Sequence, residues 1–148
     1  MWHSGRRLLA IPILTVLLLA ACSPSSSAPA AKDPAVVVEK NAETGLSRLT
    51  LSAKAAERLG IATAAVIDHQ IGGGRTAVPY AAVIYDASGK TWTYTNTDGL
   101  VFVRHAITVD RIEADRAVLS AGPPIGTMVV TVGVAELWGI ETGVGGGH

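Results

Sequence analysis

The spacing of apolar residues changes twice along the chain, and each spacing predicts a different kind of segment. Residues 8–19 form an almost continuous apolar run, which is shorter than the about 20 residues that a membrane-spanning helix needs. Residues 23–34 consist of Ser, Pro and Ala with one Lys and one Asp, and contain nothing large to bury. From Val36 onward, short apolar runs and alternating patterns are separated by turn residues. The pattern therefore predicts an export segment, a flexible tether and a folded β-rich part.

The first half of the folded part is predicted to contain a hairpin and a short helix. Residues 36–38 and 48–51 are β-rich, and a loop over residues 41–45 separates them. Ser52 can cap a helix over residues 53–59, and Gly60 can end it in the left-handed conformation. The core-facing positions of this segment are predicted to be Leu51, Ala55, Leu59 and Ile61. A strand over residues 61–67 follows.

The second half reads as β structure throughout. Strands are predicted over residues 78–85, 90–96, 100–109, 117–120 and 127–132, with turns at 86–89, 97–99, 111–116 and 122–124. The predicted fold class is mainly β, a small antiparallel barrel-like or sandwich-like domain with one short helix. Its parts are an N-terminal β segment (36–71), a Gly linker (72–77), a second β domain (78–138) and a flexible Gly-rich tail (139–148).

The N-terminus has the layout of an export signal. Arg6 and Arg7 precede the apolar run, and small residues end it. The ending Leu19-Ala20-Ala21-Cys22 resembles the lipobox of bacterial lipoproteins. The resemblance implies that residues 1–21 are a signal peptide, that Cys22 carries the lipid, and that residues 22–35 form a tether. An ordinary secretory signal with Cys22 there by chance is the alternative.

Composition limits the chemistry that the mature protein can carry out. Cys22 is the single cysteine, so its lipidation leaves none for a disulfide, a thiolate metal site or a nucleophile. Removing Arg6 and Arg7 leaves a formal charge near −2, because the precursor carries 12 basic and 12 acidic residues. Such a balance gives no reason to expect a nucleic-acid partner.

Candidate catalytic and metal sites are sparse. The four histidines, His3, His69, His105 and His148, show no spacing that brings two of them onto one metal. No Ser lies near a His and Asp pair in a pattern typical of a triad. The sequence therefore predicts neither enzyme nor cofactor. Three aromatic residues, Trp92, Tyr94 and Phe102, form either an exposed platform or, as period-two aromatics usually do, part of a core.

Several blocks resemble one family when taken together. They are residues 78–83, 89–94, 102–104 and 107–109, followed by 118–122, Gly126, 129–130 and 133–137. Their order and spacing look like the membrane-proximal part of periplasmic adaptor proteins of RND-type efflux pumps. Residues 49–66 are similar to the opening segment of these adaptors. A full adaptor places a lipoyl-like domain and a helical hairpin between the two regions, and here only residues 68–77 fill that gap.

The resemblance implies an abbreviated adaptor-like lipoprotein in the cell envelope, an accessory of an RND-type transporter without the hairpin that reaches an outer-membrane channel. A free-standing envelope binding module and, least favoured, an enzyme are the alternatives. An Asp directly after the lipidated Cys resembles an inner-membrane retention signal, but here Ser23 follows Cys22. The lipid anchor can therefore lie in either membrane.

Residues for partner contact are predicted from the long strand over residues 100–109. Val101, Val103, Ile107 and Val109 share one row, which is predicted to face the core together with His105. The partner-binding residues are then expected to be Phe102 and Arg104 on the opposite row, with Asn96 and Asp98 in the nearby polar turn. A solvated face is the alternative for each of them.

Overall fold

The structure of the protein is a computed structural model that describes residues 34–69 and 74–144. The predicted signal peptide, Cys22, nearly all of the tether, and Gly72 and Gly73 lie outside the described residues. The elements in chain order are β1 (Val36–Lys40), β2 (Ser47–Leu51), α1 (Ala53–Leu59), β3 (Ala62–Ala65), β4 (Ile67–His69), β5 (Arg75–Pro79), the 3-10 helix η1 (Tyr80–Ala82), β6 (Ile84–Tyr85), β7 (Thr91–Asp98), β8 (Val101–Glu113), β9 (Arg116–Ala121), β10 (Met128–Val132) and α2 (Val134–Thr142).

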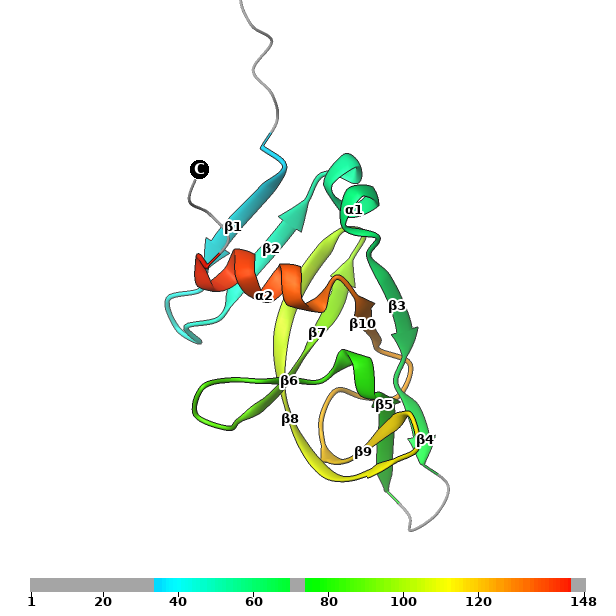
Figure 1. The fold of residues 1–148 in the computed structure, drawn as a ribbon. Coiled ribbons are helices and arrows are strands. Elements are labelled where there is room, and N and C mark those ends of the chain that lie inside the picture. Colours follow the sequence, from blue (N-terminus) through cyan, green and yellow to red (C-terminus); the bar gives the residue numbers. More distant parts are fainter. Residues whose placement is uncertain (1–33, 70–73, 145–148) are drawn as a thin grey trace, which may run out of the picture. The chain divides into compact units, whose positions relative to one another are not determined.

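The strands form one curled antiparallel sheet that makes a half-barrel (Figure 1). Its main path runs β3-β10-β7-β8-β9-β5-β4, so the fold class is mainly β, as the sequence predicts. The two ends of this path, β3 and β4, are consecutive in the chain and meet at Val66. The backbone of Val66 bonds the turn before β10, donating to the Thr127 carbonyl and accepting from the Gly126 amide, each at 2.8 Å. The curl therefore brings the two sheet ends together on one stretch of chain.

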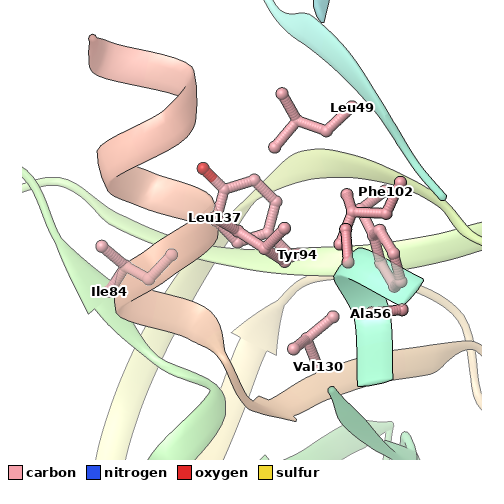
Figure 2. Close-up of a cluster of buried hydrophobic side chains, with 9 residues drawn as sticks. Leu49, Ala56, Ile84, Tyr94, Phe102, Val130 and Leu137 are labelled. Carbon is pink, nitrogen blue, oxygen red and sulfur yellow. The ribbon is translucent and has the colours of Figure 1, made fainter. Parts of the chain in front are cut away.

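The buried apolar side chains form two clusters on different faces of this curled sheet. The first cluster (Figure 2) lies between the strands and the two helices and contains Leu49, Leu51, Ala55, Ala56, Ile84, Tyr94, Phe102, Val130 and Leu137. The second contains Val66, Val78, Ala82, Ile107, Ala117, Leu119 and Val129. Strand β8 contributes Phe102 to the first cluster and Ile107 to the second, because side chains an odd number of positions apart point to opposite faces of a strand.

Local sequence accounts for the predicted elements that the structure confirms. Strands β1 and β2 form the expected hairpin, with Val36 opposite Leu51. The Ser52 side chain accepts from the Ala55 amide at 3.2 Å, and Gly60 ends α1 with a φ of 62°. At the β6–β7 turn the Asp86 carboxylate accepts from the Ser88 amide at 2.8 Å and from the Trp92 indole at 2.9 Å.

The boundaries around Pro79 differ from the prediction. Strand β5 already begins at Arg75, so residues 75–77 belong to a strand rather than to a Gly linker. The single strand predicted over residues 78–85 is interrupted by η1, in which the Val83 amide donates to the Tyr80 carbonyl at 3.0 Å. Pro79 cannot donate a ladder hydrogen bond, and its ring favours the turn that buries Ala82. Similarly, β8 continues through Glu113, which shortens the predicted turn at 111–116 to residues 114–115.

A second helix occupies part of the predicted tail. Helix α2 reaches Thr142, so residues 139–142 are helical, and the prediction of one short helix is wrong. Val134, Leu137, Trp138 and Glu141 recur at helical spacing, and Leu137 is fully buried. Gly139 obscures this pattern in the sequence, because glycine is an unfavourable residue inside helices. None of the helices in residues 34–69 and 74–144 is long and apolar enough to cross a membrane.

Candidate functional site

The four residues predicted for partner contact do not share one surface. Phe102 is only 1% exposed and belongs to the first cluster, so the prediction that it points away from the core is wrong. The reason is the hairpin β1–β2, whose strand β2 pairs with β8 and places Leu49 opposite Phe102. A simple alternation along β8 could not reveal that β2 and both helices cover this end of the strand.

Asn96 and Asp98 lie at the turn between β7 and β8, where a register shift separates them. The Asn96 side-chain amide donates to the Gly99 carbonyl at 2.7 Å, which holds the turn, while Asp98 is exposed. Asn96 also lines a groove of about 380 Å³ between this turn and the end of α1. Of the predicted contact residues, these two are the ones placed where a partner can reach them.

Arg104 lies on the face of the sheet that α2 covers. Its guanidinium carbon is 4.3 Å from the centre of the Trp92 ring and 4.9 Å from that of Trp138, which are cation–π distances. Its Nη2 atom is 3.2 Å from Oε1 of Glu141, a side chain that is 5% exposed. The second oxygen of Glu141 accepts a hydrogen bond from the Tyr94 hydroxyl at 2.5 Å. We call these five residues, Trp92, Tyr94, Arg104, Trp138 and Glu141, the Arg104 network.

The Arg104 network fixes α2 to the sheet by electrostatics as well as by packing. Burial raises the pKa of Tyr94, and its hydrogen bond to the Glu141 carboxylate raises it further. The nearby Arg104 charge acts in the opposite direction on the same pKa. Each member of the network except Trp92 thus has a polar or charged partner across the helix–sheet boundary. Within the described residues, Nε of Arg104 has no hydrogen-bond partner. The role of the network is structural, because it attaches α2 to the sheet.

A second charged group lies at the other end of β8, and we call it the Arg111 cluster: His69, Arg75, Asp110, Arg111 and Glu113. Arg111 donates from Nε to Glu113 at 2.6 Å and from Nη1 to Asp110 at 2.7 Å. Its Nη2 lies 3.1 Å from Nε2 of His69, and Arg75 is 3.4 Å from Asp110. The carboxylates of Asp110 and Glu113 raise the pKa of Arg111. The guanidinium therefore makes three polar contacts, but it remains open to water.

The Arg111 cluster sits on the outer face of β4, β5, β9 and β8. Arg111 lies opposite Val118, and Val118 lies opposite Ala77, so these residues share one face. Val118 and Ala77 are at most 1% exposed, yet neither belongs to the two apolar clusters. We infer that the aliphatic parts of the charged side chains cover them. The cluster is thus a charged cover over a small apolar patch.

An open groove of about 750 Å³ separates the β6–β7 turn from the second half of β8. Its lining includes Tyr85 and Lys90 on one side and Thr108, Arg111 and Ile112 on the other. Strand β7 ends its pairing with β8 at Thr91 opposite Ile107. From Thr108 onward, the described residues provide β8 with a partner strand, β9, on one side alone. The groove therefore borders an unpaired strand edge.

The described residues contain no group of three His, Cys, Asp or Glu side chains that could hold a metal ion. His105 lies exposed on β8 opposite Thr93, so the prediction that it faces the core is wrong, and His69 lies on a different strand, β4. His3 and His148 lie outside the described residues. Charged side chains of the Arg104 network contact other members of that network, and those of the Arg111 cluster contact other members of that cluster. None of these contacts joins a charged side chain to a nucleophile. Trp138, Glu141 and the Arg111 cluster were missed in the sequence, although the i, i+3, i+4, i+7 spacing in α2 contained a signal for the first two.

Comparison of the chain with protein-family models, with curated proteins and with solved structures finds no match in any of the three.

Proposed function

We propose that the protein is a lipid-anchored, adaptor-like accessory subunit of an RND-type efflux transporter and acts by docking to it at the membrane. The observation that carries this proposal is the way the two adaptor-like regions combine. Residues 49–66 supply most of β2 together with α1 and β3; β2 pairs with β8, and β3 pairs with β10 of the second region. Two regions that a full adaptor separates by a lipoyl-like domain and a hairpin thus form one folded unit here (Figure 1).

Docking is proposed to involve the turn between β7 and β8 and the neighbouring end of α1. Asp98 is exposed at this turn, and Asn96 lines the groove beside it. Phe102 forms the floor of the same groove from the core side. Arg104 contributes indirectly, because it holds α2 in place through the Arg104 network.

The lipid at Cys22 supplies membrane affinity in this proposal. Each buried methylene of an acyl chain contributes about 0.8 kcal/mol, and two or three chains make a firm anchor. Confinement by the anchor and tether raises the effective concentration of the domain near a membrane partner. A weak docking interface can therefore be occupied.

The anchor and the partner can be tested in the same cells. Cys22→Ala should move the protein from the membrane fraction to the soluble fraction or leave it uncleaved. Affinity capture of the intact lipoprotein from detergent-solubilised membranes should recover an RND-type transporter, and deletion should change the efflux of its substrates. Recovery of no transporter component, with unchanged efflux of drugs and metals, would contradict the proposal.

A free-standing binding module is the second candidate, and the open groove beside Tyr85 and Lys90 favours it. In that case a small molecule should remain bound to the purified protein, and native mass spectrometry would detect it. A retained small molecule together with no captured transporter would make this the better account.

A further inference from the structure

Two strand edges of the molecule present unpaired backbone to solvent. Strand β1 pairs with β2 on one side, and no described strand pairs with its other side. Residues 108–113 of β8 pair with β9 and leave the edge that borders the groove free. Unpaired edges of this kind are templates for a further strand. Figure 1 shows β1 and the lower part of β8 well separated in one copy, so they cannot pair within it.

Both edges also carry exposed apolar side chains. Val37 and Val38 of β1 are 40% and 47% exposed, although they point to opposite faces of the strand. Near the free edge of β8, Ile112 and Tyr85 are similarly exposed. Pairing of the two edges would remove part of this apolar surface from water.

The charges on the two edges match in a single antiparallel register. When Val38 lies opposite Ile112, Glu39 lies opposite Arg111. Opposite charges that face each other across strands are stabilising, whereas like charges are destabilising. A shift by two residues in one direction places Glu39 opposite Val109 and loses this ion pair, and a shift by two in the other direction places Glu39 opposite the like charge of Glu113.

We propose that β1 of one copy pairs antiparallel with the free edge of β8 of a second copy, in the register Val38–Ile112 and Glu39–Arg111. Charged side chains on edges ordinarily prevent strands from pairing, and here their signs select this register over others. Arg111 is partly exposed, so exchange of its internal partners costs little. The two proposed pairs use residues 111 and 112, which lie beyond the β-bulge between Val109 and Arg111.

The pairing joins different surfaces of the two copies. Such a head-to-tail contact leaves one free β1 and one free β8 edge on each dimer, so further copies add to form a ring or a filament. This inference goes beyond the proposed function, since it requires neither a transporter nor a lipid.

Disulfide trapping tests the register directly. The full chain with Cys22→Ser contains no cysteine, so single cysteines can be introduced as Val38→Cys in one preparation and Ile112→Cys in another. After mixing and mild oxidation, the 38–112 disulfide should form at least about tenfold faster than a 38–98 disulfide with the exposed control Asp98→Cys. Equal rates for the two pairs would overturn the proposal.

Charge exchange tests the same contact without cysteine. Glu39→Arg and Arg111→Glu should each weaken the association measured by sedimentation about fivefold, and both changes in one chain should restore it. Glu39→Arg leaves β8 unchanged, so its effect can be read even if Arg111→Glu disturbs the fold. A chain that stays monomeric at all concentrations, unchanged association of Glu39→Arg, or a folded double variant that does not restore association would contradict the proposal.

Discussion

Arg104 and Arg111 occupy the same strand, β8, and each contacts carboxylate groups, but their surroundings differ. Arg104 is 16% exposed and pairs with a carboxylate that is 5% exposed, beneath α2. Arg111 is 38% exposed and pairs with Asp110 and Glu113 at the surface. Removing one partner of a buried ion pair leaves an uncompensated charge, whereas water replaces a partner that is lost at the surface. An arginine thus attaches α2 to the sheet at one end of β8, whereas at the other end an arginine makes surface contacts that water can replace.

The largest expected effect follows from removing the buried guanidinium. Arg104→Ala should lower the free energy of unfolding by about 3–5 kcal/mol, because Glu141 then stays buried without its counter-ion. Denaturant titration measures this loss. Arg104→Ala combined with Glu141→Leu should recover part of the stability, since the double change removes both charges. A loss below about 1 kcal/mol in the single variant would show that the Arg104 network does not hold α2.

A smaller effect is expected at alkaline pH and involves Tyr94. Burial and the bond to Glu141 raise the pKa of Tyr94 in the folded protein above its value in the unfolded chain. The stabilising contribution of the protonated phenol is therefore complete below about pH 10 and is lost as the pH rises toward the folded-state value.

Thermal unfolding between pH 9 and pH 11 checks this dependence. Tyr94→Phe has no ionisable phenol at this position, so its stability should fall less steeply over that range than the stability of the parent protein. Tyr85→Phe serves as a comparison, because Tyr85 is exposed; desolvation and the neighbouring Tyr80 also raise its pKa, but less than burial raises that of Tyr94, so its removal should change the profile less. Parallel pH profiles for the parent protein and Tyr94→Phe would contradict the assignment.

The smallest effect is expected in the Arg111 cluster. At low salt Arg111→Ala should lower the free energy of unfolding much less than Arg104→Ala does, and this loss should shrink further at 1 M salt, where exposed charges are screened. The cost of Arg104→Ala should change much less with salt. Denaturant titrations of both variants at two salt concentrations test this contrast. An equal loss of unfolding free energy in Arg111→Ala and Arg104→Ala would contradict it.

The sequence predicts elements whose causes are local. Ser52 and Gly60 bound α1 through a side-chain cap and a left-handed residue, and Asp86 organises its turn through bonds to nearby amides. The features that sequence reasoning missed depend on the curl of the sheet. Phe102 is buried because β2, which is distant in sequence, pairs with β8 at that point.

The candidate site was less predictable for the same reason. Glu141 meets Tyr94 across 47 positions of sequence, and His69 meets Arg111 across 42. Periodicity within one segment indicates which residues share a face, but it does not reveal which faces meet. Asp98 is the predicted contact residue whose exposure follows from a local signal, the Asp-Gly turn.

Photo-crosslinking in living cells tests the central claim of transporter docking most directly. A photoreactive amino acid replaces Asp98 in the otherwise unchanged protein, and a control carries it at Ala114, in the turn at the opposite end of β8. We predict a crosslink from position 98 to an RND-type inner-membrane transporter that is absent from position 114 and is weakened by Cys22→Ala. Equal labelling of a transporter from both positions, or no labelling of a transporter from position 98, would contradict the account.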